Sequence, residues 1–339
     1  MKQITRIAID LSKGAFQLHA IDAEERVVLC RQLKRGQVLG FFAKMAPCRV
    51  GMEACASAHY WAREIGALGH EVVLIPPAFV KPYVKRGRKN DANDAAAICE
   101  AMARHSVTTV PVKTPGQQAV LMLHRARKML VGQRTMLANA LRAHLAEFGI
   151  VAPCGGKGLA TLIALAVDAA DPALPALARE ALAMLAAQLR DAEAKIDALD
   201  HRIREACVTD EACRRLATIP SIGPITASAI VATVGDPRRF KTGRDFAAWL
   251  GLVPSQHSTG GRTVLGPITK AGDRHIRSLL VLCATGMLRY GKRSPWIAAL
   301  LGRMEARKAT VAIANKLARI AWAILAHGGT YRRQAGLNV

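Results

Sequence analysis

Short apolar runs separated by polar breaks dominate the first 110 residues and have the length and spacing of strands. The pattern predicts five strands, at 4–10, 15–21, 26–32, 48–53 and 70–75. Helix-like patterns cover residues 36–45 and 57–68. Three consecutive strands followed by alternating helices and strands indicate a mixed sheet with helices packed against it. Residues 1–112 are therefore predicted to form an α/β domain.

Helical periodicity replaces this pattern in the rest of the chain. Residues 115–148 form one long basic helical pattern, and a glycine- and proline-containing break follows, which predicts a hinge near 151–158. Residues 174–206 have heptad-like spacing that suits a coiled-coil arm or a dimer contact. From residue 214 onward the pattern predicts mostly short helices. The fold class is thus α/β plus all-α, with a helical arm over 113–212 and a helical domain over 213–339.

The charge of the chain indicates a polyanionic partner. Lys and Arg number 48 against 25 Asp and Glu, which gives a net charge of +23 and a pI near 10.3. Nucleic acid is the commonest polyanion that such proteins bind. Because the basic residues run along the whole chain, we favour this reading over a solubility feature or binding to acidic lipid.

Other classes of protein are disfavoured by what the sequence lacks. No secretory signal pattern opens the chain, and residues 158–170, read as its most apolar stretch, are shorter than the about 20 residues needed to span a bilayer. The eight cysteines include no Cys-x-x-Cys pair and no cluster at zinc spacing. We expect a cytoplasmic protein with reduced thiols, no structural zinc and no membrane partner.

Four acidic residues stand where a metal site is expected. Asp10 and Glu53 end two predicted strands, and Asp91 and Asp94 lie three residues apart at the start of a predicted helix. Carboxylate oxygens suit Mg²⁺, and two such ions can stabilise both the attacking and the leaving oxygen of a phosphodiester displacement. Each acid alone has a structural alternative, such as a helix N-terminal charge for Asp91 or a tight turn for Asp10. Together, in a basic chain, the four favour a metal site.

Basic residues beside these acids are candidate contacts to nucleic acid. The run before Asp91 supplies Lys81, Lys85, Arg86, Arg88 and Lys89. Tyr83 within this run could stack on a base. A solvated charged face is the alternative, but the position beside the acids favours contacts to the phosphate backbone.

Two motifs in the last third of the chain suggest further contacts. Residues 216–227 read as helix, tight turn and helix, a helix-hairpin-helix pattern in which Ser221 replaces the first glycine and Gly223 is kept. Such a turn can bind phosphate through backbone amides, although an ordinary helical hairpin has the same pattern. Ser258 lies in a predicted glycine-flanked loop, followed by Arg262, Lys270 and Arg274. Its hydroxyl could attack a phosphodiester, although most such serines are turn residues.

These motifs, in this order, resemble the DEDD-type insertion-sequence transposases, a family of bridge-RNA-guided serine recombinases. Residues 7–10, 50–54 and 89–95 match the D-E-D-D set of the family's RuvC-like, RNase H-like domain. Residues 219–223, 246–252, 258–261 and 270–272 match its carboxy-terminal transposase domain. The resemblance covers nearly the whole chain.

The resemblance implies a composite mechanism. Asp10, Glu53, Asp91 and Asp94 would bind Mg²⁺, and a serine from another protomer would attack double-stranded DNA to form a phosphoserine link. Excision would yield a DNA circle, a structured RNA would pair with donor and target, and the assembly would be a dimer or tetramer. Spacing to residues 270–272 makes Ser258 the nucleophile, whereas alignment from Gly251 makes it Thr259.

Three other functions are alternatives to transposition, and each makes a different demand on the sequence. An RNase H-like nuclease such as a junction resolvase would use the four acids without a covalent serine step, and would leave the C-terminal half unexplained. A non-catalytic nucleic-acid-binding protein would bind without Mg²⁺-dependent strand breakage. An actin-like ATPase requires glycine-rich phosphate loops, which residues 10–13 do not provide.

Overall fold

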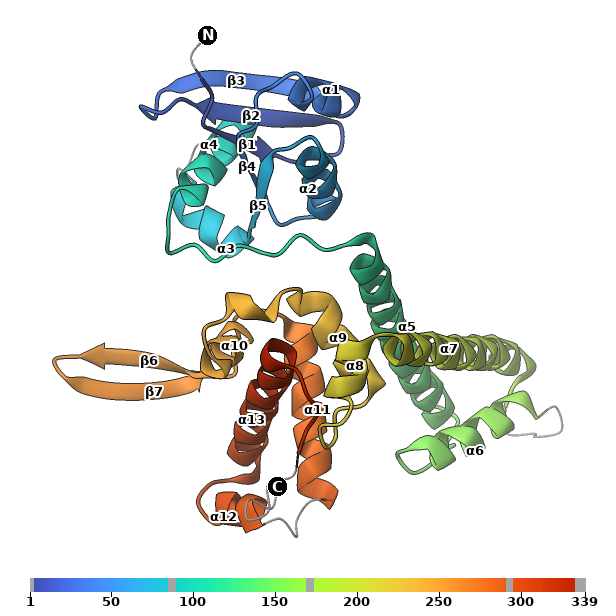
Figure 1. Cartoon of the computed structure of the whole chain (residues 1–339). Helices are drawn as coiled ribbons and strands as arrows, with labels where there is room; N and C mark the ends of the chain where they lie inside the picture. The colour runs from blue at the N-terminus through green and yellow to red at the C-terminus, as the bar shows by residue number, and fades with distance from the viewer. Residues whose placement is uncertain (1–2, 85–89, 169–173, 291–294, 333–339) are drawn as a thin grey trace. The chain divides into compact units, whose positions relative to one another are not determined.

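The structure is a computed structural model that describes residues 3–84, 90–168, 174–290 and 295–332 (Figure 1). It divides into two compact units: residues 1–115 with 234–236, and residues 116–233 with 237–339. The first unit is a mixed α/β domain and the second is mainly helical, so the predicted fold class is confirmed at this level. The finer division at residues 112 and 212 stays a prediction.

A five-stranded mixed sheet forms the centre of the first unit. Its strands are β1 (Arg6–Asp10), β2 (Ala15–Ile21), β3 (Val27–Lys34), β4 (Arg49–Glu53) and β5 (Glu71–Ile75). Their order is β3-β2-β1-β4-β5, with β1, β2 and β3 antiparallel and β1, β4 and β5 parallel. All five begin and end within two residues of the predicted strands, because apolar side chains alternate between the two covered faces.

Helices cover both faces of this sheet (Figure 1). The elements are η1 (Arg35–Gln37), α1 (Val38–Phe42), α2 (Ala58–Ala67), α3 (Pro77–Val80), η2 (Lys81–Tyr83) and α4 (Asp91–Met102). Ile7 and Ile9 of β1 pack in one core with α1 and α2, where Phe16 and Trp61 meet edge to face at 5.0 Å. Ala8 points to the other face and packs against α4. This alternation fixes α4 on the face opposite α1 and α2.

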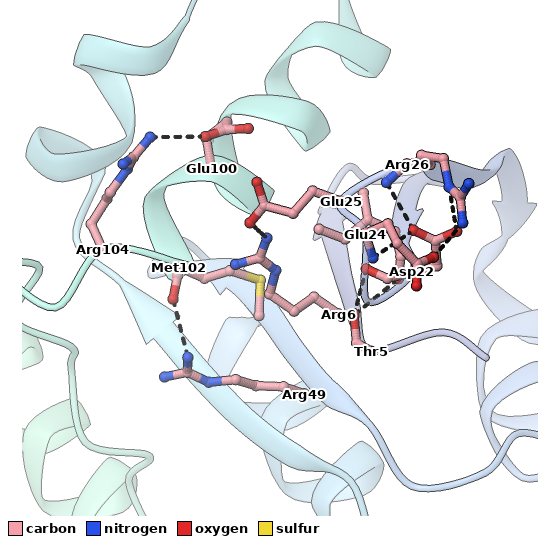
Figure 2. A network of polar contacts seen from close by, with 11 residues as sticks. Thr5, Arg6, Asp22, Glu24, Glu25, Arg26, Arg49, Glu100, Met102 and Arg104 are labelled. Atoms are coloured by element: carbon pink, nitrogen blue, oxygen red, sulfur yellow. Dashed lines mark hydrogen bonds and ion pairs between the residues drawn. The ribbon is translucent and has the colours of Figure 1, made fainter. Parts of the chain in front are cut away.

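An arginine at the amino end of β4 holds the carboxyl end of α4 (Figure 2). Arg49 donates to the carbonyl oxygen of Met102, the last residue of α4, at 3.2 Å. Arg6, which is paired in register with Arg49, forms an ion pair with Glu25 at 2.8 Å. A Cβ added at Gly51 would lie 2.7 Å from the sulfur of Met102, so α4 approaches β4 closely. The start of α4 therefore lies at the opposite, carboxyl edge of the strands.

The second unit begins with three helices that share one apolar core. They are α5 (Pro115–Ala146), α6 (Gly156–Val167) and α7 (Ala176–Thr209). Along α7 a buried residue recurs at every seventh position, namely Leu182, Leu189, Ile196 and Ile203. Leu182 and Leu189 pack with Leu141 of α5 and Leu162 of α6, and Arg127 of α5 pairs with Asp200 of α7. The heptad spacing thus marks a face that is buried within this chain, and a coiled-coil contact with another chain stays a prediction.

The C-terminal part differs from the predicted run of short helices. It contains α8 (Glu211–Leu216), α9 (Pro224–Val234), η3 (Pro237–Arg239), α10 (Gly243–Trp249), β6 (Pro254–Thr259), β7 (Arg262–Ile268), α11 (Arg274–Tyr290), α12 (Pro295–Leu301) and α13 (Ala306–His327). Two of these helices have 17 and 22 residues, and β6 with β7 forms a two-stranded hairpin. The hairpin escaped the sequence reading because its residues are almost all exposed and show no apolar face.

Helix α13 is the core helix of this region. Among the described residues, α13 is the one helix whose length and composition would allow it to cross a membrane. Its apolar residues Ile313, Leu317 and Ala321 are buried, however, and it packs against α8, α10 and α11. The apolar character of α13 is therefore explained by packing inside the unit.

A buried histidine links the helices of the second unit. His124 of α5 is 2% exposed, and its Nε2 lies 3.0 Å from the hydroxyl of Ser228 in α9. Its ring centroid lies 5.6 Å from that of His275 in α11. Burial, together with the neighbouring His275 and Arg127, lowers the pKa of His124 to about 4. The imidazole is therefore neutral at pH 7.

This shift predicts acid-sensitive folding. An imidazole with a pKa near 6.5 when unfolded and about 4 when folded loses stabilisation as the pH falls below 6.5. Between pH 7.5 and pH 5.0 we expect the wild type to lose about 2 kcal/mol of unfolding free energy through this group. Urea unfolding of His124→Gln at both pH values should show a correspondingly smaller loss. His144→Gln, a change at an exposed position of the same helix, is the control, and an equal pH dependence in all three proteins would contradict the assignment.

Candidate functional site

Two of the four predicted acids end adjacent parallel strands. In the register of β1 with β4, Ile9 is paired with Met52, so Asp10 and Glu53 follow as neighbours at the carboxyl edge. Neighbouring strands lie about 4.8 Å apart, which places both side chains at one point of this edge. Both residues are partly buried.

The other two acids lie in the first turn of α4. Asn90 caps the helix by accepting a hydrogen bond from the backbone of Asn93 at 2.8 Å, which starts the helix at Asp91 as predicted. Helix α4 packs along β1, β2 and β4. Its first turn therefore carries Asp91 and Asp94 to the strand ends where Asp10 and Glu53 lie.

The electrostatics show that the four carboxylates share one site. Burial raises the pKa of Asp10 to about 6, and Asp94, Asp91 and Glu53 add to this rise by repulsion. Burial and the charge of Asp94 also raise the pKa of Glu53. Among the described residues none of the four acids forms an ion pair. The site is a concentration of negative charge in a strongly basic chain.

The donor set fits a hard divalent cation. Its oxygen-only ligands are those that Mg²⁺ and Mn²⁺ prefer. In the described parts of the chain, no three His, Cys, Asp or Glu side chains already form a coordinating group. The carboxylates are thus close enough to affect the pKa of Asp10 and Glu53, and they come from three segments that meet at one edge of the sheet.

Ser258 lies in β6 of the hairpin, which corrects the prediction of a glycine-flanked loop. The glycine pair Gly260 and Gly261 forms the tip, and both have positive φ. Ser258 is exposed, and its hydroxyl accepts a hydrogen bond from Nε2 of Gln256 at 2.7 Å. The hydroxyl is therefore accessible on a ribbon that extends from the helices (Figure 1).

The hairpin geometry separates the two candidate nucleophiles. Successive residues of a strand point to opposite faces, so the hydroxyls of Ser258 and Thr259 lie on opposite sides of the ribbon. Ser258 is paired across the ribbon with Thr263, and Thr259 with Arg262. A single DNA strand on one face could meet one of the two hydroxyls.

Part of the predicted nucleic-acid surface can be located. Lys81 lies in η2 and is exposed, whereas Lys85, Arg86, Arg88 and Lys89 lie outside the described residues. The guanidinium of Arg104 lies 5.9 Å from the ring centroid of Tyr83, so this ring already stacks with a cation. A nucleic-acid contact of the run stays a prediction.

The predicted turn at 216–227 connects α8 to α9, with Gly223 directly before α9. Ser221 has a φ of +64°, the left-handed conformation that glycine adopts most easily. The chain therefore keeps a tight turn here although a glycine is replaced, and phosphate binding by this turn stays a prediction.

The turn that carries Lys270 packs against the end of α10. A Cβ added at Gly272 would lie 1.9 Å from the carbonyl oxygen of Trp249, and Gly272 has positive φ. Arg277 donates to the carbonyls of Leu250 at 2.9 Å and Ala271 at 2.7 Å. Arg274, by contrast, is the first residue of α11 and is exposed. Sequence reasoning missed Arg277, because an arginine in a basic helix gives no signal that it binds carbonyls of another segment.

Comparison with known proteins identifies the family. Residues 7–150 match the family model named DEDD Tnp IS110, a transposase, and residues 213–300 match the model Transposase IS116/IS110/IS902 family. A probable family 20 transposase of Pseudomonas aeruginosa is 50% identical over 97% of this chain and 99% of its own length. The chain belongs to the IS116/IS110/IS902 transposase family.

Other relatives extend the picture of this transposase family. The transposase for insertion sequence element IS1328 of Yersinia enterocolitica is 40% identical over 98% of this chain and all of its own length. A pilin gene-inverting protein of Moraxella bovis is 31% identical over 38% of the chain and 43% of its own length. The family assigns DNA strand transfer to the transposase, and DEDD transposases typically use a divalent metal.

The raised pKa of Asp10 predicts that the transposase gains stability when this charge is removed. Ionised Asp10 destabilises the folded state above pH 6, because the folded pKa lies above the unfolded value of 3.8. Asp10→Asn should therefore raise the unfolding free energy at pH 8 in EDTA by about 1 kcal/mol after allowance for solvent screening. Below pH 4 the gain should vanish. Thermal melts of wild type, Asp10→Asn and the exposed-site control Asp197→Asn measure this, and a variant less stable at pH 8 would refute it.

The packing at Gly272 predicts a second stability effect. Gly272→Ala in the transposase adds a side chain at positive φ and against Trp249, so we expect a loss of about 3 kcal/mol. Gly260→Ala, at the hairpin tip with positive φ and open space around it, should cost about 1 kcal/mol. Chemical unfolding of both variants compares them. Equal losses would show that the turn does not pack tightly on α10.

Proposed function

We propose that this chain excises and inserts a mobile DNA element by Mg²⁺-dependent, serine-mediated strand exchange. The observation that carries the proposal is the association of Asp10, Glu53, Asp91 and Asp94 at one sheet edge, where burial and then the charges of the other three raise the pKa of Asp10. A family of strand-transfer enzymes with a DEDD domain has a direct use for such a site.

Asp10, Glu53, Asp91 and Asp94 would hold the Mg²⁺. When bound, the cation would neutralise charge that develops on phosphate oxygens. The protein residues position the carboxylates: α4 supplies two of them, and Arg49 holds the far end of α4 through the carbonyl of Met102. Arg49 is thus a positioning residue for this site.

Ser258 is proposed as the nucleophile. Its Oγ would form a bond to the phosphorus of a DNA phosphodiester, while the bond from phosphorus to the leaving deoxyribose oxygen breaks. The hydroxyl proton leaves to solvent or to a base, and the leaving oxygen takes up a proton. The product is a phosphoserine link, which a DNA hydroxyl can later attack to rejoin strands.

The partners follow from the same proposal. Double-stranded DNA of the element ends and of the target would bind basic residues of each unit, Lys81 in the first and Arg262, Lys270 and Arg274 in the second. A structured RNA would guide both sites, excision would pass through a DNA circle, and the active form would be a dimer or tetramer. The protein would act in the bacterial cytoplasm, at the nucleoid.

One observation favours a second function, hydrolysis without a covalent step. Among the described residues no acid or histidine forms a hydrogen bond with the hydroxyl of Ser258, whose partner is Gln256. A nuclease such as a junction resolvase would need the carboxylates alone. The experiment below separates the two functions.

The test is a PCR assay for the joined-end circle, made from the gene with its native flanking DNA. Wild type and Thr259→Ala should form circles, whereas Asp10→Asn and Ser258→Ala should reduce them at least about 100-fold, as removal of a catalytic group does. Immunoblots of the four proteins control for expression.

Each alternative has its own outcome in this assay. Circles from Ser258→Ala but not from Thr259→Ala would move the nucleophile to Thr259. Circles from both hydroxyl variants, with none from Asp10→Asn, would favour the metal-dependent mechanism without a protein nucleophile. Circles from all variants would remove the catalytic role of the carboxylates.

A further inference from the structure

A long groove lies within the second unit beside the serine hairpin. It has a volume of about 1400 Å³ and runs between α13, Trp296 of α12 and the base of β6 and β7. Leu252, Leu265 and Ile320 are among its apolar lining residues. Pockets for small molecules usually measure about 300–1000 Å³, so this groove is large enough for a chain-like ligand.

Four cations line the groove, all from α13. They are Arg307, Lys308, Lys316 and Arg319, and no acidic residue lines the groove with them. In the described parts of the chain, three of them form no ion pair, and Lys308 has a 3.8 Å contact with Glu305. Burial, followed by the charge of Arg319, lowers the pKa of Lys316. The groove therefore concentrates positive charge that one exposed glutamate, Glu305, offsets only in part, and an anionic ligand would relieve it.

An aromatic ring lies next to these cations. Trp296 is partly buried, and the ammonium nitrogen of Lys316 lies 3.8 Å from its ring centroid. Trp322 also lines the groove, and its ring is held in place because the indole nitrogen donates to the carbonyl of Pro237 at 3.1 Å. Aromatic rings and apolar walls beside cations are the features on which proteins bind bases and phosphates of an unpaired strand.

We propose that this groove binds an unpaired stretch of DNA, with bases against Trp296 and the apolar wall and phosphates on the cations of α13. A protein segment would leave the cations uncompensated unless it were strongly acidic. The inference rests on the proposed function, since strand exchange exposes single strands close to Ser258, and the hairpin that carries Ser258 forms one wall of the groove.

The lining favours DNA over RNA. Proteins distinguish RNA by polar contacts to the 2′-hydroxyl. The groove offers one neutral polar side chain, Asn315, and its amide already donates to the carbonyl of Leu252 at 3.1 Å. An apolar lining of this kind suits the deoxyribose and the thymine methyl group.

The test is fluorescence anisotropy of the full chain with a labelled oligothymidylate, a duplex of equal length and an oligouridylate. Trp296→Leu should weaken binding of the oligothymidylate about tenfold and leave duplex binding unchanged, because stacking requires an unpaired base. Lys316→Gln should lower the salt dependence of single-strand binding by about 0.7 in the slope of log K against log salt. Arg190→Gln removes the same charge from an exposed site on α7 and should leave the preference for the unpaired strand unchanged.

Several results would overturn the inference. Equal weakening of single-strand and duplex binding by Trp296→Leu would make the groove a charged surface without base stacking. Equal or tighter binding of the oligouridylate would assign the groove to RNA, and a change in sedimenting mass in Trp296→Leu would assign it to a second copy of the chain. Trp296→Phe keeps a ring and is the second variant if Trp296→Leu does not fold. A wild type that binds the oligothymidylate as expected but forms no circles would count against the proposed function alone.

Discussion

Four carboxylates brought to one partly buried sheet edge are the constraint around which the first unit can be described. Burial, followed by the charges of Asp94, Asp91 and Glu53, raises the pKa of Asp10 to about 6, which records the cost of holding an ionised carboxylate there. Two acids are fixed because β1 and β4 are neighbouring parallel strands. The other two depend on α4, whose far end is held by Arg49 and whose Met102 side chain lies against Gly51 of β4. The contact of Arg49 with Met102 in Figure 2 therefore holds the end of α4 opposite to the turn that carries Asp91 and Asp94.

The second unit differs from the first in that its candidate residue, Ser258, is exposed. Its helices form cores around α7 and α13, whereas Ser258 lies on an exposed two-stranded ribbon. A two-stranded hairpin is marginally stable alone, so the packing at its base has to support it. The turn at Gly272 and the carbonyl contacts of Arg277 supply that support at the end of α10. The four carboxylates thus lie on a partly buried framework, whereas Ser258 lies on a supported extension.

Secondary structure could be predicted from the sequence where the local pattern of apolar residues agrees with the burial of those residues in the fold. The strands from Arg6 to Ile75 were predicted because apolar residues alternate there between two covered faces, and parallel pairing of two of them brings Asp10 and Glu53 together. The start of α4 followed from Asn90. The packing of α4 on the sheet could not be predicted, because it depends on Arg49 and Gly51 meeting Met102 across 50 residues. The hairpin was missed because exposed residues carry no burial period, and α13 was underestimated because its apolar residues surround much of the helix.

The alternation of side chains along β6 has a consequence for how this ribbon can vary among relatives. Ser258 lies close to the glycine tip, and its face is set by counting residues along the regular ladder that starts at the pair of Gln256 and Leu265, beyond the register shift near the base. Adding one residue between the base and the serine turns the hydroxyl to the other side, whereas adding two restores it and moves it outward by about 7 Å. In relatives that keep this serine, insertions on the serine strand should therefore contain an even number of residues. Selection would then preserve the face on which the hydroxyl lies more strictly than the length of the hairpin.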